Sequence, residues 1–144
     1  MVNDTSRIMT IIGLVVEGIV LVILLFTGML FISQEGFFES IIQAENLPSS
    51  QEALLLAIIN ILGYVLVVLG VIVFIVFMIN LFLFIKLVQN RYDEKTLRKV
   101  LIYQSVWGGI NLLFNQVSGI LYLISGLHGM NILQKEKETI RDGL

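Results

Sequence analysis

The chain has 144 residues, of which 57% are hydrophobic and only 14% charged, and its net charge is −2. Soluble domains carry about 25% charged residues, well above the share in this chain. A soluble domain of this size could not bury so much apolar surface. The charge balance gives no support to a nucleic-acid partner. With no cysteine and one histidine, the chain lacks ligands for disulfides or a structural zinc site, and we expect neither a metal nor a cofactor. The composition predicts an all-α transmembrane helix bundle in which residues 1–144 form one domain surrounded by membrane lipid.

The first apolar run, residues 8–32, predicts a membrane-spanning helix, since about 20 residues suffice to cross the hydrocarbon core. The run is about twice as long as the hydrophobic region of a signal peptide, and no small-x-small cleavage site follows it. We therefore interpret it as a retained span.

The loop that follows, residues 33–52, contains neither Lys nor Arg. Four of its apolar residues recur at helical spacing: Phe37, Phe38, Ile41 and Ile42. The pattern is typical of a short helix in the outer membrane interface, and a hydrophobic cover over the bundle would use it equally well. We regard these four residues as candidates for binding a partner. After Pro48, residues 49–52 have the spacing of a capping box that opens the next helix.

The second span, residues 53–88, has no charge before Lys86 and no proline. As a helix it would extend ~54 Å, at about 1.5 Å per residue, whereas the hydrocarbon core is only ~30 Å thick. If Lys86 marks the inner surface, residues 63–83 cross the core and residues 53–62 protrude outward. Strong tilt is the alternative explanation.

The last apolar stretch follows a polar cytoplasmic loop at 89–99 and is either one helix or a hairpin of two spans, 100–114 and 117–133. Short loops rich in Lys and Arg stay in the cytoplasm. The hairpin places all nine basic residues on that side: Arg7, Lys86, Arg91, Lys95, Arg98, Lys99, Lys135, Lys137 and Arg141. We therefore favour four spans, with both termini and the tail at 134–144 in the cytoplasm. A single helix would give three spans.

Glu17 is the only charged residue in the first span and the first candidate for a functional site. Ionisable residues inside the membrane face the bundle interior or a water-filled cavity. Three interpretations remain open: Glu17 hydrogen-bonds to a neighbouring helix, pairs with an Arg or Lys of a partner protein, or exchanges protons in transport. Small multidrug resistance exporters, four-span proteins with a Glu in the first helix, offer an analogy for transport, although their loops are all short.

The other polar candidates inside the apolar stretches are Asn60, Asn80 and His128. Side-chain hydrogen bonds between membrane helices contribute only ~0.6 kcal/mol on average, so such residues more often serve packing than a pathway. Two glycine pairs with a spacing of seven residues predict faces for close helix contact. The pairs are Gly63 with Gly70 and Gly119 with Gly126.

The sequence contains no phosphate-binding glycine loop, His–Glu metal pair or Ser–His–Asp set, and we expect no enzyme. Its plan of spans and the segment SGILYLISG at residues 118–126 resemble a group of small bacterial four-span membrane proteins classed only as a domain of unknown function. The resemblance implies a fold but no activity and no functional residues.

The leading hypothesis is a non-enzymatic accessory or regulatory subunit in the cell membrane. Its partner would be another integral membrane protein or further copies of this chain. A small oligomeric transporter or pore that uses Glu17 is one alternative, and a holin-like or bacteriocin-immunity membrane protein is another.

Overall fold

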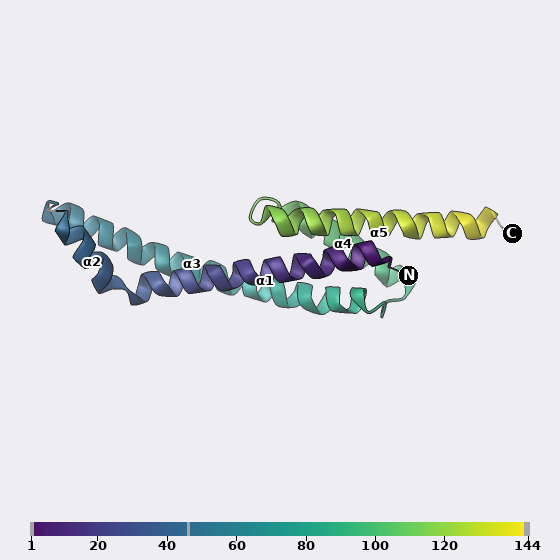
Figure 1. The fold of residues 1–144 in the computed structure, drawn as a ribbon, viewed down its shortest axis with the longest axis horizontal. Coiled ribbons are helices and arrows are strands. Elements are labelled where there is room, and N and C mark those ends of the chain that lie inside the picture. The colour runs from purple at the N-terminus through teal and green to yellow at the C-terminus, as the bar shows by residue number, and fades with distance from the viewer. Residues whose placement is uncertain (1, 46, 143–144) are drawn as a thin grey trace. The chain divides into compact units, whose positions relative to one another are not determined.

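A computed structural model describes residues 2–45 and 47–142, and every regular element in that part of the chain is an α-helix. The helices are α1 (Asp4–Ser33), α2 (Glu35–Ala44), α3 (Ser49–Val88), α4 (Glu94–Asn111) and α5 (Gln116–Asp142) (Figure 1). The prediction of an all-α fold is confirmed.

The carboxyl-terminal apolar stretch is divided between two helices. The chain turns over residues 112–115, between the end of α4 and the start of α5, instead of continuing as one helix. α4 begins at Glu94, inside the predicted loop, because Asp93 caps it. The Asp93 carboxylate accepts a hydrogen bond of 3.3 Å from the backbone N–H of Thr96. α5 likewise continues through most of the predicted tail, as far as Asp142.

Two helices, α1 and α3, are long and apolar enough to cross a membrane. In the most apolar stretch of each, only 28% and 11% of the residues are buried. A core helix of a soluble protein would be buried on most sides, so these two helices lack that environment. Within the described residues, α4 and α5 do not have the combination of length and apolar composition found in α1 and α3. The presence of four spans therefore stays a prediction.

The contacts divide the chain into two compact units. The first unit comprises the chain up to Ile19 and from Phe77 onward, and the second comprises Val20–Val76. The first unit therefore contains α4, α5 and one end each of α1 and α3.

In the first unit, α4 and α5 form an antiparallel hairpin with its backbones in contact. A Cβ on Gly108 would lie 2.5 Å from the backbone nitrogen of Leu123, and one on Gly119 would lie 2.6 Å from that of Leu112. Gly126 also faces the backbone of α4, so it shares a helix face with Gly119, as their spacing predicted. Only glycine leaves room for so close an approach.

In the second unit, glycines bring α1 and α3 together. A Cβ on Gly63 would lie 2.9 Å from the side chain of Ile32, and one on Gly28 would lie 3.0 Å from Leu66 Cβ. Gly70 faces α1 as well, so the predicted pair Gly63 and Gly70 does line one face of α3.

Candidate functional site

The Glu17 carboxylate is the point in the first unit where four helices meet. Glu17, on α1, is only 4% exposed. Its Oε2 accepts a hydrogen bond of 2.7 Å from the Tyr122 hydroxyl of α5. Its Oε1 accepts one of 3.2 Å from Trp107 Nε1 of α4 and another of 3.2 Å from Asn80 Nδ2 of α3. The carboxylate therefore joins helices that lie far apart in the sequence.

The groups around Glu17 are arranged as donors. The indole N–H of Trp107 can only donate. The amide oxygen of Asn80 accepts a 2.8 Å hydrogen bond from the Tyr103 hydroxyl, which leaves the Asn80 amino group to face Glu17. An ionised carboxylate only accepts hydrogen bonds, so the arrangement suits that form. Among the described residues no Lys or Arg pairs with Glu17, and donors take the place of a counter-ion.

A glycine one turn before Glu17 allows Tyr122 to reach it. A Cβ on Gly13 would lie 2.5 Å from the Tyr122 ring, so the bare surface of α1 accommodates the phenol. Phe84 packs against the same ring at a centroid distance of 5.0 Å. Tyr122 is fully buried by these contacts, and its hydroxyl is directed at the carboxylate.

A second polar layer lies nearer the amino end of α1, and it connects α1, α4 and α5. Thr10 Oγ1 accepts a 2.8 Å hydrogen bond from Gln104 Nε2 of α4 and lies 2.9 Å from Ser125 Oγ of α5. The Ser125 hydroxyl donates to the carbonyl oxygen of Ser6 at 2.8 Å, and the Ser6 hydroxyl donates to the carbonyl oxygen of Ser125 at 3.1 Å. All four side chains are fully buried. Within this layer, Gln104 Oε1 is buried and has no hydrogen-bond partner among the described residues.

A third layer lies beside the amino terminus of α1. Asn3 Nδ2 and His128 Nε2 are 2.9 Å apart, and the backbone N–H of Val2 donates to Asn90 Oδ1 at 3.0 Å. These bonds tie the beginning of the chain to α5 and to the loop after α3.

We call the residues that α1 and the position just before it contribute to these layers, with Gly13, the polar seam: Asn3, Ser6, Thr10, Gly13 and Glu17. They succeed one another in alternating steps of three and four residues. That spacing is the heptad spacing of a helix that packs along one stripe. In this chain, polar and small residues occupy the positions that apolar residues fill in a soluble coiled coil.

The structure brings only part of the predicted polar set together. Glu17 and Asn80 are hydrogen-bonded to each other. His128 is exposed and belongs to the layer of Asn3. Asn60 lies in the second unit, so it belongs to none of these layers.

The four candidates on α2 fall into two pairs. Ile42 is buried, at 8% exposure, and the ring of Phe38 meets that of Phe31 on α1 edge-on at a centroid distance of 5.4 Å. Phe37 and Ile41, one turn apart, are exposed. Two of the four residues therefore pack within the second unit, and only Phe37 and Ile41 offer a surface.

Several residues of these polar layers were not identified from the sequence. Neither Trp107 nor Tyr122 was linked to Glu17 from the sequence. Ser6, Thr10 and Gln104 were not singled out, because hydroxyl and amide side chains are common in membrane helices. The signal that could have found the α1 members is the three-and-four spacing of small and polar residues in an otherwise apolar helix.

Comparisons of the chain with protein-family models, with curated proteins and with solved structures gave no match.

Proposed function

We propose that the chain is a four-span integral membrane protein that acts as an accessory or regulatory subunit by binding a helix of another membrane protein. The distribution of side chains supports the membrane location. The buried polar set comprises Ser6, Thr10, Glu17, Asn80, Gln104, Ser105, Asn111, Ser118 and Ser125. Large aliphatic and aromatic side chains are exposed along α1, α3, α4 and α5. Polar groups inside and apolar groups outside suit a bundle in lipid, where every polar group needs an internal partner.

The hairpin of α4 and α5 also has polar side chains inside and apolar side chains outside. This distribution supports the proposal that the hairpin forms two spans. The Asn111 side chain donates to the Ser118 hydroxyl at 2.7 Å inside the hairpin. Ile102, Val106 and Ile124 on its outer faces are between 42% and 58% exposed. Exposure of such an apolar surface to water would be unfavourable.

One observation carries the proposed binding function: α3 presents an exposed heptad stripe. We call this stripe the α3 face, and in the second unit it comprises Leu54, Ile58, Ile61, Val65, Val68, Ile72 and Ile75. These residues follow one another in steps of four and three and are between 46% and 63% exposed. Aliphatic residues at heptad spacing, many of them β-branched, form the contact stripe of one helix against another.

Lipid alone does not account for the length of α3. The helix has no charged residue between Glu52 and Lys86, a distance of ~50 Å at about 1.5 Å per residue. Fitting this stretch into a hydrocarbon core of ~30 Å would take a tilt of roughly 50°, beyond the 0–40° range of transmembrane helices. With Lys86 at the inner surface, Leu54 and Ile58 lie outside the hydrocarbon, where a partner helix would cover them.

The geometry of Glu17 favours anchoring over transport. Both carboxylate oxygens are engaged by donors of the same chain, and the side chain is buried. A transport site has to release its carboxylate to a substrate or to water in each cycle. Here three helices would first have to give up their hydrogen bonds to it.

Site-specific photocrosslinking tests the proposal. A photoreactive amino acid at Ile58 or Ile61 should yield an adduct with another membrane protein when cells that contain the chain are irradiated. Phe26 is the matched control, because it is apolar, lies in the second unit and is 66% exposed, but belongs to α1. We expect adducts from the two α3 positions and none from Phe26.

Three results would contradict the proposal. Adducts of equal yield from Phe26 would indicate random collisions in the membrane. An adduct of twice the 16.2 kDa chain mass would replace the foreign partner with a second copy of this chain. Purification of the chain alone in every mild detergent would exclude a stable partner.

A further inference from the structure

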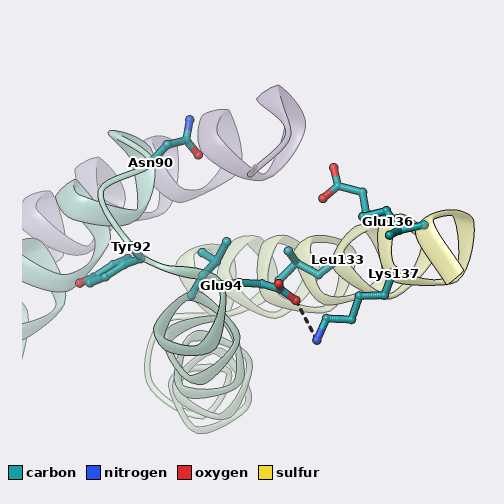
Figure 2. Close-up of a pocket in the computed structure, with 8 residues that line it drawn as sticks. Asn90, Tyr92, Glu94, Leu133, Glu136 and Lys137 are labelled. Atoms are coloured by element: carbon teal, nitrogen blue, oxygen red, sulfur yellow. Dashed lines mark ion pairs between the residues drawn. The ribbon is translucent and has the colours of Figure 1, made fainter.

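Two cavities adjoin an ion pair that links the beginning of α4 to the end of α5. Lys137 Nζ lies 2.7 Å from Glu94 Oε1, and Figure 2 shows the pair beside Leu133 at the smaller cavity, of about 260 Å³. Both side chains also line a larger cavity of about 490 Å³ between the two helices. The larger cavity differs from the smaller one because Arg98, Ile102 and Leu127 also line it.

One end of the larger cavity is basic and polar. Arg98 of α4 and Lys137 of α5 both line the cavity, and so do the amide side chains of Asn131 and Gln134. Arg98 forms no ion pair among the described residues, so its guanidinium remains available to an anion. With Glu94 balancing Lys137, the lining keeps one positive charge in excess. A guanidinium with a neighbouring ammonium is a phosphate-binding combination.

The other end of the cavity is apolar and opens onto an apolar surface. Ile102 and Leu127 line it and are 45% and 52% exposed. The same faces continue away from the basic end, through Val106 on α4 and Ile120 on α5, which are 58% and 48% exposed. The spacing of four and seven residues keeps each pair on one side of its helix. A ligand that fits has an anionic head and a long hydrocarbon tail.

We infer that the cavity between α4 and α5 binds an anionic phospholipid of the cytoplasmic leaflet. The phosphate lies between Arg98 and Lys137, and an acyl chain lies along Ile102 and Leu127. The inference rests on the membrane location and orientation in the proposed function, because the basic residues must lie at the inner surface. Basic pockets between helices at that surface attract anionic headgroups.

Native mass spectrometry of the purified full chain in neutral detergent tests this site. The probes are phosphatidylglycerol and phosphatidylcholine with identical acyl chains. The test variant is Arg98→Gln with Lys137→Gln. The control is Lys99→Gln with Lys135→Gln, which removes the same charge from the same two helices outside the cavity lining. Arg98→Gln alone is a second test variant, because it leaves the Glu94–Lys137 pair intact.

We expect the parent chain to retain phosphatidylglycerol over phosphatidylcholine. The double test variant should lose roughly thirtyfold in phosphatidylglycerol affinity and the single variant about fivefold. The control pair should change the affinity by less than about twofold. Glycerol phosphate, which has the headgroup chemistry without acyl chains, should not displace the lipid.

Equal losses in the test and control variants would overturn the inference, because surface charge alone would then explain binding. Equal retention of the two lipids would overturn it as well. Displacement by glycerol phosphate would assign the site to a soluble phosphate ester instead. If the chain resists alkaline carbonate extraction from membranes but shows no lipid preference, this inference is contradicted and the proposed function is not. Release by carbonate would overturn both this inference and the proposed function.

Discussion

The hydroxyl of Tyr122 lies 2.7 Å from Glu17 Oε2, although 105 residues separate the two along the chain. The contact exists because Gly13 has no side chain to hold the Tyr122 ring away from α1. It fixes the rotation of α1 against the α4–α5 hairpin, since a turn of either helix would separate the hydroxyl from the carboxylate. Buried polar contacts of this kind specify register between helices.

Tyr122→Phe should therefore destabilise the chain while leaving its shape unchanged. The substitution keeps the buried ring and removes one donor from the carboxylate, which should lower the free energy of unfolding by about 1–3 kcal/mol. Thermal unfolding in mild detergent, followed by circular dichroism, measures the loss. Tyr64→Phe is the matched control, because Tyr64 is 59% exposed. Equal loss in the two variants would contradict a specific role for the Tyr122 hydroxyl.

Glu17→Gln should also destabilise the chain, although it changes no volume. The new amino group would face donors, whereas the carboxylate offers acceptors to Trp107, Asn80 and Tyr122. The chain has one tryptophan, so the fluorescence of Trp107 reports directly on this layer. We expect a shifted emission maximum together with a lower thermal midpoint. Unchanged fluorescence and stability would indicate that the carboxyl group already donates a proton in the folded chain.

Gly108→Ala and Gly109→Ala should have opposite effects. A Cβ at Gly108 would meet the backbone nitrogen of Leu123 at 2.5 Å, whereas the nearest atom to a Cβ at Gly109 is Leu123 Cδ1 at 3.9 Å. We expect Gly108→Ala to cost about 3 kcal/mol, since backbone atoms cannot move aside as a flexible side chain can. Gly109→Ala should gain up to about 1 kcal/mol from its helix propensity. Equal thermal midpoints for the two variants would contradict the packing of the hairpin.

The cap of α4 should make stability depend on pH in the acid range. Hydrogen bonds from Thr96 hold the pKa of Asp93 below its ordinary value of 3.8. The stabilisation is therefore complete above the unfolded pKa and is lost as the pH falls through the lower, folded pKa. We expect the thermal midpoint to fall between about pH 4 and pH 2. Asp93→Asn, which keeps a capping side chain, should reduce that fall, and an identical pH profile would exclude Asp93 as its source.

Cysteine labelling should place the turns of the chain, because no native cysteine interferes. In the four-span topology, Glu45→Cys and Phe114→Cys react with a membrane-impermeant maleimide from outside, and Lys137→Cys reacts only after permeabilisation. Phe114 is 81% exposed in its turn, so its reactivity reports on topology. Labelling of position 114 from the inside would leave α1 and α3 as the spans. Labelling of position 137 from the outside would contradict the four-span topology.

The sequence by itself determined the helical class, because its apolar runs are too long and too uninterrupted for another fold. It also identified Glu17 and Asn80 as buried polar candidates and the glycine pairs as helix contacts, since each follows from residue type and helical spacing. It favoured a turn between residues 114 and 117 from the placement of the basic residues, and the structure has a turn over residues 112–115.

Only the tertiary structure decided which polar groups meet. The donors around Glu17 come from three other helices, and no local pattern encodes that pairing. The register of α4 on α5 depends on backbone contact at Gly108 and Gly119, and many other glycines in the sequence look the same. The faces of α2 were indistinguishable as well, until the packing of Phe38 on Phe31 left Phe37 and Ile41 exposed. Periodicity determines which residues share a face, whereas the neighbour of that face is set by packing between helices.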